Sequence, residues 1–353
     1  MIPDPIAAPE MPRRHSVAAE IRAIATYLPA GILDNDALAA AFPDRPAEKI
    51  FDKLGIRERR IAAPGETAAD LAYGAACRLF DSGVVARDEI DFLILCTQAP
   101  DYILPTSACL LQSRLGLSTA TGAFDINLGC SGFVYGLSIA TGLIASGAAR
   151  NVLLLTADTY SKFINDGDRS VRTLFGDGAA ATLVGPAAPR GAAIGPFVFG
   201  TDGRGANSLI VPTGGARRAR SPETALAAQD AAGNTRAADD LYMNGSGVMS
   251  FSLKVVPAAI TELLDKTGLT RDDIDFFVLH QANKFMLDAL AKALRVPAEK
   301  VPRFYETVGN TVSSSIPFLL EDMLATGRIR PGMRLVLVGF GVGLSWSATL
   351  VQC

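Results

Sequence analysis

The chain has 353 residues, of which 49% are hydrophobic and 20% are charged, and its formal net charge is −3. This length and apolar content predict a large core in one or two domains of an α/β protein and exclude a disordered chain. The small negative charge gives no basis for nucleic acid as a partner. The apolar runs have the length of strands, well short of the ~20 residues of a membrane-spanning helix, so no membrane segment is expected.

The N-terminus shows no basic segment followed by an apolar stretch, so we expect no secretory signal. Residues 1–18 contain several prolines and are predicted to form a flexible arm. The cysteines at positions 77, 96, 109, 130 and 353 form no CxxC pair and show no metal-ligand spacing. We therefore expect no metal, no other cofactor, and a reduced, cytoplasmic setting.

Between residues 19 and 185, short apolar runs alternate with helical stretches, and Gly-Cys-Ser-Gly at 129–132 lies between a predicted strand and a predicted helix. This places Cys130 at a helix N-terminus, where unpaired amides and the helix dipole favour a thiolate. The flanking glycines permit a tight turn and close approach of a substrate. Two interpretations stay open from this motif alone: a nucleophile, or a buried inert cysteine.

The middle of the chain is predicted to be less regular. Buried strands are expected at 152–157 and 180–184, with Phe-Gly-Asp-Gly at 175–178 as a structural turn in which Asp177 braces a loop. Residues 203–240 are rich in Gly, Ala, Arg and Ser and predict a long surface excursion. A helical pattern resumes at 249–266.

His280 directly follows an apolar strand predicted at 276–279. Ligands of α/β proteins bind at the carboxyl ends of parallel strands, so His280 is expected to face such a crevice. The other histidine, His15, lies in the N-terminal arm, which leaves His280 as the partner for a Cys–His mechanism. The alternative is a buried structural histidine.

The chain ends in a predicted strand pair at 333–339 and 344–352, joined through Gly-Phe-Gly-Val-Gly at 339–343. This segment lacks the GxGxxG order and no helix follows it, so a dinucleotide site is not expected. It is interpreted either as a hairpin or as a source of a backbone amide for an oxyanion.

An internal repeat relates the two halves of the chain. Residues 87–95 (Arg-Asp-Glu-Ile-Asp-Phe-Leu-Ile-Leu) match residues 271–279 (Arg-Asp-Asp-Ile-Asp-Phe-Phe-Val-Leu) almost position by position. The repeat predicts the same order of elements in each half, and it places Asn310, in Gly-Asn-Thr at 309–311, where Cys130 lies in the first half. The alternatives are two generic αβ units, and an asparagine that only caps a helix.

Together, Gly-Cys-Ser-Gly-Phe at 129–133, His-Gln-Ala-Asn at 280–283 and Gly-Asn-Thr at 309–311 resemble the thiolase superfamily, and most closely β-ketoacyl-acyl-carrier-protein synthase III. Segments at 55–59, 175–178, 243–245 and 343–346 support the resemblance. It implies a thiolase-like, five-layered αβαβα fold of the α/β class, built from two duplicated halves at 19–185 and 186–353. It also implies a homodimer.

The resemblance implies a role for each motif. Cys130 would accept the acyl group, His280 and Asn310 would serve decarboxylation, and the backbone amides of Cys130 and Val342 would form the oxyanion hole. An acyl-CoA would acylate Cys130, and malonyl-acyl-carrier protein would then undergo decarboxylative Claisen condensation. Acyl-CoA and acyl carrier protein are therefore the expected partners, in fatty acid biosynthesis.

Substrate contacts are implied for a further set of residues: Arg169, Asn244, Gly245, Leu104, Phe340 and Lys53. Some positions depart from the family pattern. Lys49 stands where a tryptophan is common, Lys53 and Phe285 stand at positions of arginines, and Leu104 replaces a phenylalanine that gates the acyl pocket. These departures leave the acyl chain and the mode of carrier-protein docking open.

Two other functions remain compatible with the same motifs. One is acyl transfer from acyl-CoA or acyl carrier protein to a small-molecule acceptor in a specialised pathway. The other is a non-catalytic partner subunit of a heteromeric synthase. The intact Asn310 favours decarboxylative condensation over the first, and retention of Cys130, His280 and Asn310 together argues against the second.

Overall fold

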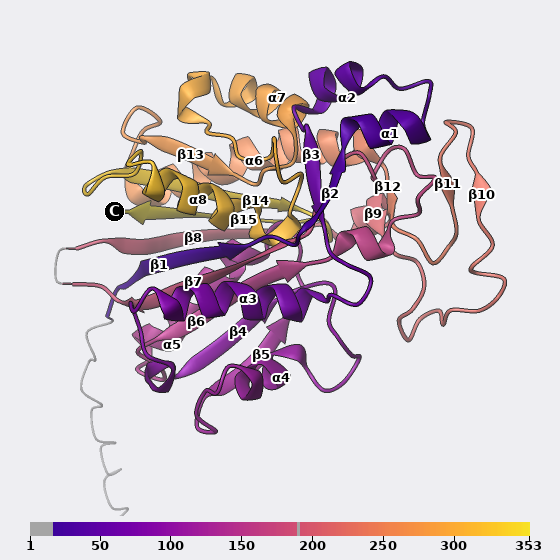
Figure 1. Ribbon diagram of the computed structural model, residues 1–353. Helices are drawn as coiled ribbons and strands as arrows, with labels where there is room; N and C mark the ends of the chain where they lie inside the picture. The colour runs from indigo at the N-terminus through magenta and orange to yellow at the C-terminus, as the bar shows by residue number, and fades with distance from the viewer. Residues whose placement is uncertain (1–16, 189–190) are drawn as a thin grey trace, which may run out of the picture.

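The computed structural model describes residues 17–188 and 191–353, so nearly all of the predicted N-terminal arm, including His15, lies outside the described residues. Two large sheets form the core (Figure 1). The first has the order β1-β7-β6-β4-β5, with bounds Ala19–Tyr27, Gly178–Pro186, Val152–Asp158, Phe92–Cys96 and Gly122–Ile126. The second has the order β13-β14-β15-β8, with bounds Phe276–Leu279, Arg334–Gly341, Ser345–Gln352 and Ala193–Thr201.

The two sheets repeat one topology. In the first, β4 and β6 are parallel, whereas β6–β7 and β7–β1 are antiparallel. In the second, β13 and β14 are parallel, whereas β14–β15 and β15–β8 are antiparallel. The matching segments of the sequence repeat end in β4 and β13, which occupy equivalent places. The predicted duplication is therefore confirmed, and the proposed division between the halves falls at the last residues of β7.

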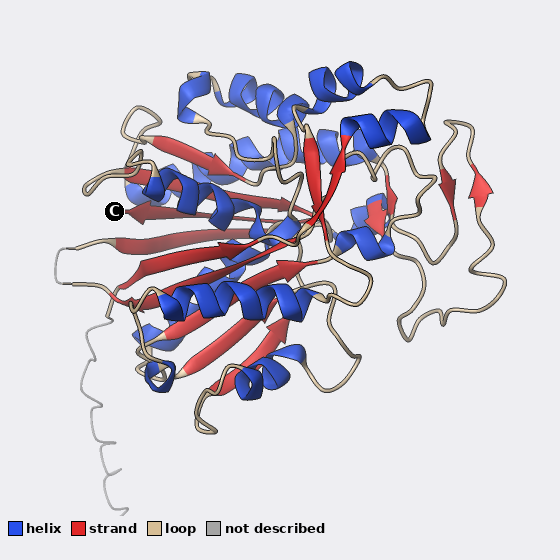
Figure 2. Ribbon diagram, viewed as in Figure 1, coloured by secondary structure: helices blue, strands red, loops and turns tan. Residues whose placement is uncertain are grey.

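Helices and sheets alternate in five layers (Figure 2). Helices α3 (Ala68–Asp81) and α4 (Ser107–Arg114) cover the outer face of the first sheet. Helices α5 (Gly132–Ala145) and α8 (Ser315–Ala325) lie between the sheets. Helices α6 (Gly245–Thr267) and α7 (Lys284–Leu294) cover the second sheet. The predicted αβαβα arrangement is confirmed.

Side-chain alternation along the strands produces these layers. On β6, Leu153 and Leu155 face the outer helices, whereas Val152 and Leu154 face the inner helices. Strand β6 is therefore apolar on both faces, as expected for a strand in a sheet that helices cover on both sides. The inner helices are consequently enclosed by the two sheets, and the segments that precede them, carrying Cys130 and Asn310, are drawn into the interior.

Helix α6 is the only helix within the described residues that is long and apolar enough to cross a membrane by length and composition. Val256, Ile260 and Leu263 are fully buried on its inner face, which packs against the second sheet and α7. Its apolar character is therefore accounted for by its place in the core.

The remaining elements lie around one end of the sheets. Helices α1 (Asn35–Ala41) and α2 (Ala47–Leu54) connect the antiparallel strands β2 (Gly31–Asp34) and β3 (Glu58–Ile61), and α2 packs against α7. Residues 203–240 project beside them in Figure 1, with short strands β9 (Leu209–Ile210), β10 (Ala228–Gln229), β11 (Thr235–Arg236) and, just beyond, β12 (Tyr242–Met243). Short 3-10 helices are η1 (Arg87–Glu89), η2 (Tyr160–Phe163), η3 (Gly203–Ser208), η4 (Ala298–Lys300) and η5 (Val312–Ser314).

The excursion is attached to the body of the protein. The Thr235 amide donates to the Gly167 carbonyl at 3.0 Å, and Arg236 forms an ion pair with the buried Asp168 at 3.0 Å. The excursion therefore covers the loop that precedes β7.

Candidate active site

The turn that carries Cys130 packs directly against the glycine-rich segment 339–343. Cys130 is only 4% exposed, and a Cβ placed on Gly341 would stand 2.8 Å from its Sγ. A Cβ on Gly339 would stand 2.7 Å from the Cys130 carbonyl oxygen. Only glycine fits at such separations. The chain therefore needs glycine at both positions to bring its last strand pair against the cysteine.

The sulfur of Cys130 lies in an environment that favours the neutral thiol. Burial, and then the nearby Asp158, raise the pKa of Cys130 to about 12, although the Val342 and Cys130 backbone amides act in the opposite direction. The expectation that the helix start favours a thiolate is therefore wrong for this structure. Loss of hydration outweighs the few amides that approach the sulfur.

His280 follows β13 at the carboxyl end of the strand, and its amide donates to the Val338 carbonyl at 2.8 Å. The imidazole lies edge-on to the Phe340 ring, with the centroids 5.6 Å apart, and Nδ1 is 2.7 Å from Ser315 Oγ. Burial lowers the pKa of His280 to about 3, against a hydrogen bond to the Val312 backbone. The ring is therefore neutral at physiological pH.

Asn310 is held by its backbone on both sides. Its amide donates to the Leu174 carbonyl at 2.9 Å, and its carbonyl accepts from the Gly176 amide at 3.0 Å. The side-chain Oδ1 accepts from the Val312 amide at 3.0 Å, which assigns the Nδ2 protons to the opposite side of the group. The turn at 175–178 is structural, as predicted, and its Gly176 amide holds the backbone of Asn310 in place.

Two short segments link the three predicted catalytic residues. Phe340 touches the His280 ring while the glycines on either side of it contact the Cys130 turn. Val312 bonds to both His280 and Asn310, and it does so at a φ of 54°, a conformation that is strained for a β-branched residue. The repeat predicted that Cys130 and Asn310 precede equivalent inner helices, and they do.

The predicted substrate-binding residues are scattered more widely. Phe340 is buried against His280, but Lys53 and Asn244 are exposed, and Leu104 is 79% exposed. Asn244 caps α6 by accepting from the Gly247 amide at 3.0 Å, and Gly245 is the first residue of that helix.

Arg169 is already engaged within the protein. Its NH1 group lies 2.8 Å from both carboxylate oxygens of Asp44, and the backbone of Gly233 lies against the guanidinium. A phosphate would have to share this cation with Asp44.

Three polar residues of the site were not identified from the sequence: Asp158, Ser313 and Ser315. Asp158 ends β6, is completely buried, and accepts hydrogen bonds from Ser313. The available signal was the run of serines at 313–315 directly before an apolar helix, because polar side chains in a buried segment need partners. Asp177 braces a loop as predicted, accepting from the Ala62 amide at 2.8 Å.

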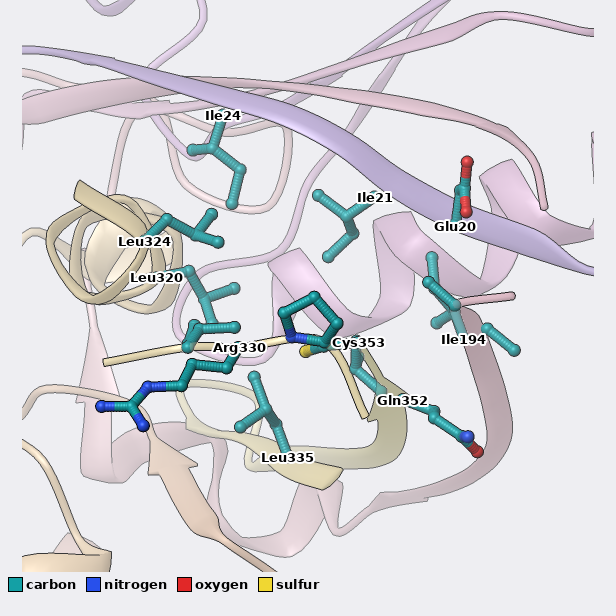
Figure 3. A pocket seen from close by; sticks show the side chains of 15 residues that line it. Glu20, Ile21, Ile24, Ile194, Leu320, Leu324, Arg330, Leu335, Gln352 and Cys353 are labelled. Carbon is teal, nitrogen blue, oxygen red and sulfur yellow. The ribbon is translucent and has the colours of Figure 1, made fainter. Parts of the chain in front are cut away.

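A separate apolar cavity of about 240 Å³ lies between β1, β8 and α8 (Figure 3). Ile21, Ile24 and Leu320 project into it, and Glu20 and Arg330 lie at its edge. None of the predicted catalytic or substrate-binding residues lines it. Within the described part of the chain, no group of three His, Cys, Asp or Glu side chains is placed to hold a metal ion.

Comparison with known proteins identifies the family. The profile of 3-oxoacyl-[acyl-carrier-protein (ACP)] synthase III matches residues 124–203, and the profile of its C-terminal part matches residues 264–353. The β-ketoacyl-[acyl-carrier-protein] synthase III of Chlamydia caviae is 39% identical over 334 residues, covering 95% of this chain and 96% of the relative. That of Clostridioides difficile is 38% identical, covering 95% and 98%.

Solved structures agree with these relatives. A crystal structure of a 3-oxoacyl-(acyl-carrier-protein) synthase III is 59% identical with a TM-score of 0.93, covering 95% of this chain and all of the other. The 3-oxoacyl-(acyl-carrier protein) synthase of Burkholderia xenovorans is 36% identical, with a TM-score of 0.86 and coverages of 95% and 94%. The priming β-ketosynthase of the R1128 polyketide pathway is 32% identical, with a TM-score of 0.83 and coverages of 98% and 99%.

The fold and these similarities define a thiolase-like condensing enzyme and an acyltransferase. The chain belongs to the 3-oxoacyl-[acyl-carrier-protein] synthase III family.

The raised pKa of Cys130 predicts a characteristic reactivity. Alkylation of Cys130 by iodoacetamide is expected to rise about tenfold per pH unit from pH 7 to 9 without levelling off, because only the thiolate reacts. The rate for a free cysteine thiol, with a pKa of about 8.5, begins to level off as the pH approaches 9. Intact-mass spectrometry measures the rate, with Cys130→Ala as the control for the modified site. A plateau below pH 8 would show that the helix start stabilises the thiolate after all.

Proposed function

We propose that this protein catalyses a two-step decarboxylative condensation, with Cys130 as the nucleophile and His280 and Asn310 as the groups that stabilise the enolate. The observation that carries the proposal is the pair of short segments that link these three residues within one buried site. An acyl-CoA is the donor, and malonyl-acyl-carrier protein is the acceptor.

In the first step, the Cys130 sulfur attacks the thioester carbonyl and the bond from carbonyl carbon to CoA sulfur breaks. The cysteine proton leaves with CoA, so a neutral thiol is exchanged for a neutral thiol and no external base is consumed. The tetrahedral oxyanion needs donors, and the Val342 amide already approaches the Cys130 sulfur. The amides of Cys130 and Val342 are the proposed oxyanion hole.

In the second step, malonyl-acyl-carrier protein loses CO2, and the electron pair of the broken bond forms a thioester enolate. The enolate carbon attacks the acyl group on Cys130, which releases the sulfur as a thiolate that takes up one proton. The products are 3-oxoacyl-acyl-carrier protein, CO2 and free Cys130. Neutral N–H donors suit this step, because a protonated imidazole would protonate the enolate.

The resting site supports these roles. The low pKa of His280 keeps its ring neutral, and the Nδ2 protons of Asn310 lie opposite its bond to Val312. Neither acyl transfer to a small-molecule acceptor nor a non-catalytic subunit is favoured by the relatives, which carry the name of the condensing enzyme.

We also propose that the enzyme is a homodimer. The loop before α4 exposes three consecutive large apolar side chains: Tyr102 at 60%, Ile103 at 92% and Leu104 at 79%. So much contiguous apolar surface at the tip of one loop is typical of an interaction site. In a homodimer this loop would place Leu104 near the partner's acyl pocket, as the family pattern implies. A cytoplasmic location, consistent with five free cysteines, belongs to the same proposal.

The first test is acylation of Cys130. Incubation with acetyl-, butyryl-, hexanoyl- or octanoyl-CoA is expected to add the acyl mass to the protein, and addition of malonyl-acyl-carrier protein should remove it with release of CO2. Cys130→Ala should lose both reactions, whereas Cys109→Ala, at an exposed cysteine, should retain them. Intact-mass spectrometry follows each step. The proposal fails if no acyl-CoA modifies Cys130, or if Cys130→Ala retains activity.

Asn310→Ala should separate the two steps. Removing one donor to the enolate is expected to lower CO2 release by about 10²- to 10³-fold, while acylation of Cys130 stays within about threefold of the wild type. Single-turnover release of CO2 from the preacylated enzyme measures the effect. Asn151→Ala, at an asparagine in the turn before β6, is the control and should leave both steps unchanged. Equal losses in both steps would contradict the assigned role.

Ile103→Asp tests the homodimer. A carboxylate at the most exposed apolar position of the loop is expected to convert the dimer to a monomer, because a buried charge needs a partner. Size-exclusion chromatography with light scattering measures the mass. Ile32→Asp, at a residue that is 55% exposed on β2, is the matched control and should stay dimeric. A monomeric wild type, or a dimeric Ile103→Asp variant, contradicts the proposal.

A further inference from the structure

Asp158 is a buried carboxyl group at the junction of the two halves. It is the last residue of β6, is 0% exposed, and belongs to the half that carries Cys130. Its Oδ1 accepts from the Gln98 amide at 2.9 Å. Its Oδ2 accepts from Ser313 Oγ at 2.5 Å and from the Ser313 amide at 3.3 Å. Ser313 belongs to the other half, three residues after Asn310.

Ser314 and Ser315, which follow Ser313, bond to different halves of the protein. Ser314 Oγ donates to the Thr156 carbonyl of β6 at 2.9 Å, and Ser315 Oγ lies 2.7 Å from His280 Nδ1. The same segment includes Val312, which bonds to both His280 and the Asn310 side chain. One short stretch, 310–315, therefore sets the positions of both groups proposed to stabilise the enolate.

A fully buried carboxyl group costs free energy unless its oxygens are satisfied. Burial raises the pKa of Asp158 to about 7, against the hydrogen bonds from Ser313 and Gln98. Its charge also disfavours ionisation of Cys130. Asp158 is therefore unfavourable both for folding and for ionisation of Cys130. Its bonds to Ser313 provide a reason for a carboxyl group at this position.

We propose that Asp158 is a positioning residue for the decarboxylation step, because it anchors the segment 310–315 to the half of the protein that carries the nucleophile. It does not touch the substrate. It acts through Ser313 on the placement of Asn310 and His280. The inference rests on the proposed function, since it concerns the second step of that reaction.

Asp158→Asn tests this role. The amide can still accept from Gln98, but its NH2 group then faces the donating amide of Ser313, so the anchor on 310–315 is weakened. Release of CO2 from malonyl-acyl-carrier protein by the preacylated enzyme is expected to fall about tenfold to a hundredfold, the usual cost of a misplaced catalytic group. Acylation of Cys130 should stay within about threefold of the wild type or become faster, because the substitution removes a negative charge near the sulfur.

Two further variants separate anchoring from charge and from stability. Ser313→Ala keeps the charge of Asp158 and removes one anchoring bond, so it should lower CO2 release less than Asp158→Asn does and leave acylation unchanged. Asp125→Asn is the control. Asp125 lies in β5 of the same sheet and accepts from the Ser107 and Ala108 amides, each at 2.8 Å, which lie outside 310–315 and the segments bonded to it. This variant is expected to change the rates of acylation and of CO2 release by the same factor, or to leave both unchanged.

Single-turnover acylation and CO2 release, with the melting temperature of each variant, decide the outcome. A selective loss of CO2 release in Asp158→Asn and Ser313→Ala supports the inference. Equal losses in both steps, no loss, or the same selective loss in Asp125→Asn overturns it. If Asp158→Asn does not fold, Ser313→Ala decides by the same criterion. A wild type that no acyl-CoA acylates overturns the proposed function as well, whereas a wild type that completes both steps leaves that function standing.

Discussion

The close packing of the segment 339–343 against the Cys130 turn is the contact on which the site depends. The segment belongs to the last strand pair of the second sheet, and the turn begins the inner helix of the first half. Glycine at 339 and 341 lets two backbones meet where a single methyl group would collide. Because Phe340 lies between those glycines and touches His280, the same contact also sets the distance between the nucleophile and the histidine.

The electrostatic state of the site follows from this burial. The cysteine is a thiol and the histidine is a neutral ring, because water is excluded from both. Such a site has no strong base at rest. It suits a reaction in which one thioester is exchanged for another and an enolate is stabilised by neutral donors, since neither step needs a strong base in the protein.

The two halves have kept the same architecture while their polar residues have diverged. The strands that are equivalent in the repeat lead to Cys96 in one half and to His280 in the other. Cys96 is fully buried and donates to the Leu128 carbonyl at 3.1 Å, so it serves packing. His280 instead contacts Phe340 and Ser315. The junction between the halves is correspondingly polar, with Asp158 and the serines of 313–315 bonded across it.

Local patterns in the sequence were sufficient for much of this protein. Short apolar runs predicted the strands, the repeat predicted the paired halves and the equivalent helix starts of Cys130 and Asn310, and the motifs indicated the family. These features depend on residues close together in the chain or on segments that resemble each other. The protonation state of Cys130, the anchoring by Asp158 and the engagement of Arg169 by Asp44 were decided only by the tertiary structure. Each depends on which distant groups exclude water from a side chain or donate to it, and the spacing of residues along the chain does not contain that information.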